Sequence, residues 1–69
     1  MMHYCAYSFA DLFKAANGRP ATSKENQTFE KLSQPERNRE VAKLAERANW
    51  QTESVKTSEG LFVAFWPSP

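Results

Sequence analysis

Four side chains have the chemical types that nucleophilic or acid–base catalysis requires. Cys5 and His3 place a thiol two residues from an imidazole, and a thiol next to a base is one way to make a nucleophile. On a strand these side chains share a face but lie too far apart for a firm hydrogen bond, and no third group that would orient the base is identifiable. Glu36 and Glu40 form an acidic pair, but they fall on an exposed helical face rather than in a cleft. We therefore predict that the protein is not an enzyme.

The residues needed for metal, phosphate or disulfide chemistry are also missing. One histidine and one cysteine do not make a recognisable set of metal ligands. Gly18 and Gly60 are the two glycines of the chain, and they stand too far apart to form a phosphate-binding loop. Cys5 cannot form an internal disulfide, so we interpret it as a part-buried structural residue. The sequence predicts no cofactor and no metal.

Basic side chains are the candidates for nucleic-acid recognition. Four fall on one predicted helix and a fifth on a predicted strand: Arg37, Arg39, Lys43, Arg47 and Lys56. Glu36, Glu40 and Glu46 stand among them at spacings that favour pairs within the helix. The net charge of +1 adds little long-range attraction to a phosphate backbone. A solvated, salt-bridged helix face is the ordinary interpretation of this pattern.

Three helices are predicted to position these residues. Ser8 and Asp11 have the spacing of a capping box and predict a helix over residues 9–16, which ends at Asn17–Gly18. Ser23 with Asn26 indicates a short second helix over residues 24–32, although this polar stretch is also compatible with a loop that becomes helical only near Phe29. A capping box with a proline, Ser33-Gln34-Pro35-Glu36, begins a third helix that runs to about Asn49. Its buried stripe is Val41, Leu44, Ala45 and Ala48.

The most apolar run of the chain, residues 60–66, is predicted to be a central strand. Leu61, Val63 and Phe65 alternate with Phe62, Ala64 and Trp66, so both faces of the strand are apolar. Residues 51–57 read as a polar strand joined to this run by the turn Ser58-Glu59-Gly60. Residues 2–7 are predicted to form the strand on its other side, with the direction of pairing left open.

Together these elements predict one α+β domain over residues 1–69. Its sheet has three strands, antiparallel or mixed, in the order β-α-(α)-α-β-β, with the C-terminal strand central and the helices on one face. A chain of 69 residues buries a modest core, so we expect oligomerisation, such as a homodimer, to add stability. The chain shows no export signal and no long apolar run, which predicts a cytoplasmic protein with no membrane association.

Two functions follow from this outline. The first is a small non-enzymatic binding protein, a regulator or inhibitor that contacts a protein partner or a second copy through an aromatic sheet face. The residues assigned to that face are Tyr4, Phe62, Trp66 and Trp50. The alternative is a winged-helix-like nucleic-acid-binding protein, because helices followed by a two-stranded ribbon are the order of elements in that module. It would use Arg37, Arg39, Lys43, Arg47 and Lys56.

Overall fold

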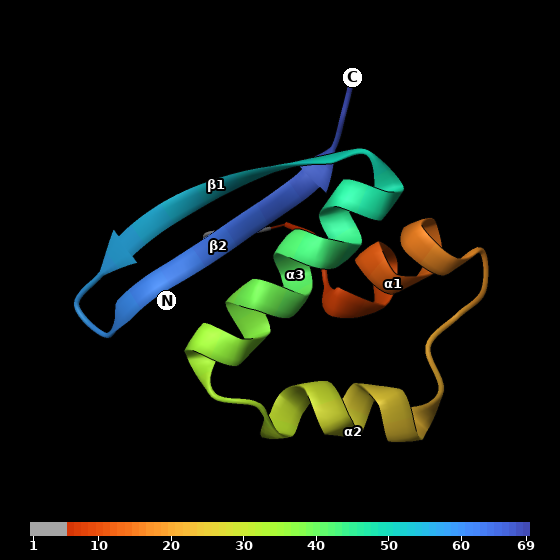
Figure 1. Ribbon diagram of the computed structural model, residues 1–69, viewed down its shortest axis with the longest axis horizontal. Coiled ribbons are helices and arrows are strands. Elements are labelled where there is room, and N and C mark those ends of the chain that lie inside the picture. The colour runs from red at the N-terminus through yellow and green to blue at the C-terminus, as the bar shows by residue number, and fades with distance from the viewer. Residues whose placement is uncertain (1–5) are drawn as a thin grey trace.

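Three helices precede a β-hairpin in the computed structural model, which describes residues 6–69. The elements are α1 (Phe9–Asn17), α2 (Ser23–Lys31), α3 (Gln34–Ala48), β1 (Trp50–Thr57) and β2 (Gly60–Pro67). Figure 1 shows α3 between the hairpin and α1, while α2 connects α1 to the start of α3. The α+β class predicted from the sequence is confirmed.

Each helix begins with the same arrangement of side chains. A hydroxyl accepts from the backbone N–H three residues later, and the carboxylate at that later position accepts from the backbone N–H of the hydroxyl residue. The pairs are Ser8–Asp11, Thr22–Glu25 and Ser33–Glu36. The predicted second helix is confirmed, but its cap is Thr22 rather than Ser23. Gly18 ends α1 at φ 72° and Asn49 ends α3 at φ 59°, both in the left-handed region.

The β1–β2 hairpin has a short turn at Ser58–Glu59, and its register runs from Trp50 opposite Pro67 to Thr57 opposite Gly60. Gly60 has φ 124°, a backbone conformation that suits glycine. Directly opposed residues of an antiparallel pair project to the same face. One face of the hairpin therefore carries Trp50, Val63 and Phe65, and it is the face that packs on the core.

The hydrophobic core lies where α1, α3 and β2 meet. Its buried members are Leu12, Val41, Leu44, Ala45 and Phe65. Partly buried side chains packed against them are Phe9, Ala16, Phe29, Ala48, Trp50 and Val63. The predicted apolar stripe of the third helix is therefore confirmed as the core-facing side of α3.

The predicted three-stranded sheet is not shown. The sheet that residues 6–69 form has two strands, β1 and β2. Most of the expected N-terminal strand falls on residues 2–5, which lie outside the described part of the chain, while Ala6 and Tyr7 form a bend. Tyrosines and the absence of proline or glycine suggested a strand there, but such a short stretch has no strong local preference.

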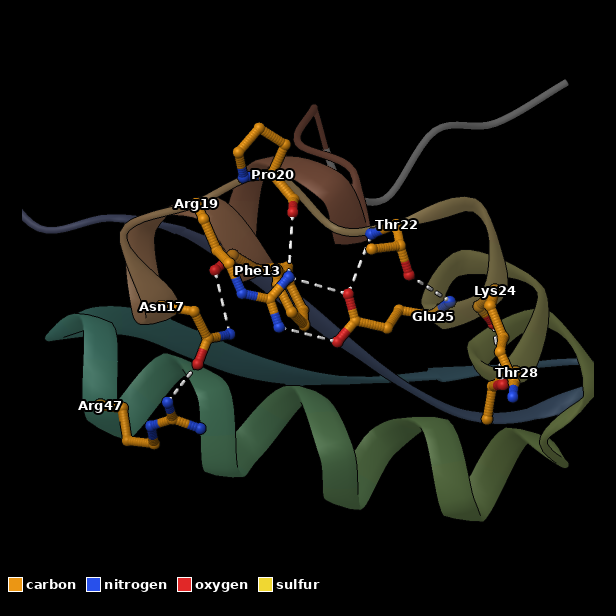
Figure 2. A network of polar contacts seen from close by, with 9 residues as sticks. All are labelled: Phe13, Asn17, Arg19, Pro20, Thr22, Lys24, Glu25, Thr28 and Arg47. Carbon is orange, nitrogen blue, oxygen red and sulfur yellow. Dashed lines mark hydrogen bonds and ion pairs between the residues drawn. The ribbon is translucent and has the colours of Figure 1, made fainter.

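Helix α2 is attached differently from the other helices, because none of its residues is buried. The Phe29 ring stacks on the Phe9 ring with centroids 4.0 Å apart and planes at 12°. Arg19 donates two hydrogen bonds to the Glu25 carboxylate, each 3.0 Å long, and its guanidinium lies 4.9 Å from the Phe13 ring centroid. Figure 2 shows this network between the α1–α2 connection and the first turn of α2.

The Glu25 carboxylate is held in its charged form by these donors. The hydrogen bond from Arg19, followed by the one from the backbone N–H of Thr22, lowers the pKa of Glu25 from 4.5 to about 2. The same carboxylate therefore completes the helix cap and joins α2 to the preceding connection.

Candidate functional site

The outward face of α3 carries a basic stripe. Arg39, Lys43 and Arg47 are four residues apart, so they lie one above another along the helix. Arg39 and Lys43 are exposed on the side away from the core. Arg47 is exposed as well, but it donates a hydrogen bond to Oδ1 of Asn17 at the end of α1 (Figure 2). Arg39 and Lys43 are therefore the two members of the stripe that point to solvent without a contact to another helix.

Acidic neighbours neutralise this stripe only in part. Lys43 Nζ lies 3.8 Å from a Glu40 carboxylate oxygen, with the Lys43 side chain 75% and the Glu40 side chain 41% exposed, so the pair contributes little stability. The Glu36 carboxylate accepts from the backbone N–H and the hydroxyl of Ser33. These bonds, together with the charge of Arg39, lower the pKa of Glu36. Arg39 itself forms no ion pair with any residue that the structure describes.

Arg37 lies on a different side of α3 from the stripe. Two residues along an α-helix correspond to a rotation of about 200° around its axis, which turns Arg37 away from Arg39 and towards the hairpin. Its side chain is half-buried, and its Nε is fully buried with no hydrogen-bond partner among the described residues. Arg37, one of the basic residues proposed for nucleic-acid binding, therefore does not share the outward face of α3 with Arg39 and Lys43.

Two amides fix the end of the hairpin against the start of α3. Gln34 Nε2 donates to Oδ1 of Asn38 at 2.9 Å, and Asn38 Nδ2 donates to the backbone oxygen of Leu61 at 3.0 Å. Neither amide was selected from the sequence, although their spacing of four residues is one that allows such a bond. The bond to Leu61 depends on a contact across 23 positions, for which the sequence contains no signal.

Two neighbouring grooves adjoin the hairpin tip, residues 58–61. One has a volume of about 450 Å³ and is lined by Gln34, Arg37, Thr57, Glu59, Gly60, Leu61 and Phe62. The other has a volume of about 370 Å³ and is lined by Gln34, Pro35, Asn38, Arg39, Glu59, Gly60 and Leu61. Arg37 lines the first groove and Arg39 the second, and Glu59 borders both.

Lys56 lies on the hairpin near the same tip. It is exposed and stands directly opposite Leu61 in the register, so it projects from the hairpin face that also carries Val63 and Phe65. Leu61 is 51% exposed. A lysine and an exposed leucine thus lie at the tip end of the hairpin, close to the first turns of α3.

Among the described residues assigned to an aromatic sheet face, Trp50 does not lie with Phe62 and Trp66. Tyr4 is outside the described residues, and Trp50 projects to the opposite face from Trp66 and Phe62. Trp50 packs beside Phe65, at 6.3 Å between ring centroids, and makes an edge contact with Tyr7 at 5.3 Å. Side chains alternate along each strand, and Gln51 rather than Trp50 stands opposite Trp66. Trp50 therefore projects to the core-facing side of the hairpin.

The hairpin face that points away from the core is partly covered rather than open. It carries Val55, Phe62, Ala64 and Trp66. Ala64 is 3% exposed, and the other three are half-buried. Val55, Phe62 and Trp66 therefore offer only part of their apolar surface to a partner.

Within residues 6–69 the structure brings together no group of three histidine, cysteine, aspartate or glutamate side chains that could hold a metal ion. The helices of the same part of the chain are too short or too polar to cross a membrane. No protein-family model, curated protein or solved structure matches this chain. The geometry of α3 and the hairpin is therefore the basis for a functional proposal.

Proposed function

We propose that the protein binds duplex DNA with the exposed face of α3 and the tip of the β-hairpin. The observation that carries this proposal is the orientation of α3. The core and the hairpin cover one side of this helix, while Arg39 and Lys43 project from the other. Only Leu32 and Ser33 separate α2 from α3, a connection as short as that of helix-turn-helix proteins, in which the second helix enters the major groove.

The hairpin supports the same mode of binding. Its tip is held against the first turns of α3 by Asn38, and Lys56 projects near that end. A helix with an adjacent ribbon can contact base edges and the flanking phosphates together, as winged-helix proteins do. B-form DNA has a major groove wide enough for a helix, whereas the major groove of A-form RNA is too narrow.

The charge of the site sets the expected strength of binding. Arg39, Lys43 and Lys56 offer three contacts to phosphate, with Glu36 and Glu40 close to the first two. Each phosphate contact contributes about −0.9 to the slope of log K against log salt concentration, so we expect a slope of about −3. Binding should accordingly be weak for random sequence and depend moderately on salt.

The test is a titration of the purified chain with a fluorescent DNA duplex, followed by anisotropy, at salt concentrations between about 50 and 200 mM. An RNA duplex of the same sequence is the matched control for groove geometry. We expect measurable DNA binding at the lowest salt, a slope of about −3 and weaker binding to RNA. The absence of DNA binding by folded protein at low salt would refute the proposal.

The hairpin register favours a second candidate, protein binding through the face that carries Val55, Phe62, Ala64 and Trp66. In this proposal the chain is a small regulator or inhibitor that contacts a protein partner or a second copy of itself. Tryptophan is a frequent anchor of such contacts. The cytoplasmic setting expected from the sequence belongs to both proposals.

Sedimentation velocity over a range of protein concentrations tests self-association. Gln51 stands directly opposite Trp66 on the same face and is exposed, so Gln51→Ser is the matched control for Trp66→Ser. A wild-type dimer that Trp66→Ser dissociates and Gln51→Ser preserves would support an interface on this face. A wild-type monomer at every concentration would exclude the homodimer.

A further inference from the structure

Arg37 differs from the other arginines on α3 because its guanidinium is drawn in beside the hairpin. The side chain is half-buried, and its Nε lacks an acceptor among the residues that the structure describes. It also forms no ion pair within residues 6–69. Leaving this donor buried without an acceptor is unfavourable. The two terminal nitrogens of the guanidinium are not among the buried atoms that lack a partner, so they are the ones that can donate to a ligand.

The groove beside Arg37 has the size and chemistry to receive an anion. Its volume is about 450 Å³, and the polar residues Gln34 and Thr57 are among those that line it. A guanidinium binds phosphate through paired N–H groups, which gives it both charge and directionality. The groove lies between the start of α3 and the hairpin tip, and it borders the surface assigned above to DNA.

We propose that this groove binds a backbone phosphate of the DNA duplex, with the Arg37 guanidinium as its donor. This inference rests on the proposed function and adds a fourth phosphate contact to Arg39, Lys43 and Lys56. Two arginines would then contact the backbone near the hairpin tip, Arg37 in one groove and Arg39 in the other.

Glu59 opposes this contact. Glu59 lines the groove, and no ion pair joins it to Arg37 in the described part of the chain. The carboxylate therefore leaves the guanidinium available but repels an entering phosphate. Because of this repulsion, the wild-type protein should have a lower affinity for DNA than a variant without the Glu59 charge.

The experiment measures DNA affinity against salt for wild type, Arg37→Met, Arg37→Lys and Glu59→Gln. Arg37→Met keeps most of the apolar stem and removes the charge, so we expect on the order of tenfold weaker binding and a salt slope smaller in magnitude by about 1. Arg37→Lys should keep the slope but bind less tightly than wild type, because lysine lacks the paired donors. Glu59→Gln should bind more tightly.

Thermal denaturation of the same variants separates binding from folding. Arg37→Met removes a buried donor that has no acceptor, so its midpoint should equal or exceed that of wild type. Lys14→Met is the control for charge, since Lys14 is exposed on α1 and should leave the slope unchanged.

The results distinguish the two proposals. If wild type binds DNA and folded Arg37→Met keeps the same affinity and slope, the phosphate groove is wrong while the proposed function stands. If folded wild type does not bind DNA at low salt, both are wrong. Tight binding of a glutamate-rich peptide that depends on Arg37, without DNA binding, would assign the groove to an acidic protein segment and overturn the phosphate assignment.

Discussion

Helices α2 and α3 begin in the same way and are held in place by different forces. Each starts with a hydroxyl–carboxylate capping box, Thr22–Glu25 in α2 and Ser33–Glu36 in α3. Helix α3 buries Val41, Leu44 and Ala45, whereas α2 buries none of its residues. Helix α2 is held by a ring stack and an exposed ion pair. The comparison teaches that local signals begin a helix, while its tertiary packing decides how firmly it is held.

The largest effect should come from the inward side of α3. Leu44 is 2% exposed in the core, so Leu44→Ala should cost about 2–5 kcal/mol of unfolding free energy. Phe29 packs only partly against the same core, so Phe29→Ala should cost less, about 1–2 kcal/mol. Urea denaturation of both variants gives the two values. A larger cost for Phe29→Ala would mean that α2 is as firmly held as α3.

The helix caps provide a smaller and sharper comparison. Thr22→Ala and Ser33→Ala each remove one hydroxyl acceptor at a helix start, at a typical cost of about 1 kcal/mol. We expect Ser33→Ala to lower the global unfolding free energy, because α3 unfolds only with the core. Thr22→Ala should mainly increase amide hydrogen exchange within α2. Equal exchange in α2 of the wild type and Thr22→Ala would contradict this difference.

The dependence of stability on pH should show how much the Arg19–Glu25 ion pair contributes. The folded pKa of Glu25 is lowered to about 2 from 4.5, so its contribution is present above about pH 4.5 and is lost as the pH falls towards 2. Arg19→Ala should reduce this loss in thermal melts between those values, while the hydrogen bond from Thr22 preserves part of it. An identical decline in wild type and Arg19→Ala would show that the ion pair does not stabilise α2.

Much of the fold follows from local patterns in the sequence. The capping signals and apolar spacing predicted three helices. The alternation of residues 60–66 predicted which side chains of β2 share each face of the strand. The cap of α2 was assigned to Ser23, although Thr22 and Glu25 already had the spacing that the structure uses. The third strand was inferred from the need to cover an apolar strand, and such an argument does not specify which segment provides the cover.

Less of the candidate site than of the fold could be predicted from the sequence. Periodicity placed Arg39 and Lys43 on the outward side of α3, because that side follows from the buried stripe. The position of Arg37 against the hairpin and the Asn38–Leu61 bond both depend on how α3 and β2 cross. Crossing geometry is set by packing between distant segments, so the grooves beside the hairpin tip could not be predicted.

Removing the two exposed charges on the outward side of α3 tests DNA binding by this helix most directly. Arg39→Gln combined with Lys43→Gln removes two exposed charges and no buried contact, so the thermal midpoint should stay nearly unchanged. Against salt concentration, we predict a slope of about −3 or steeper for wild-type DNA binding, reduced in magnitude by about 2 in the double variant. Lys14→Gln should behave as wild type. Equal slopes for the wild type and the folded double variant would contradict DNA binding through α3.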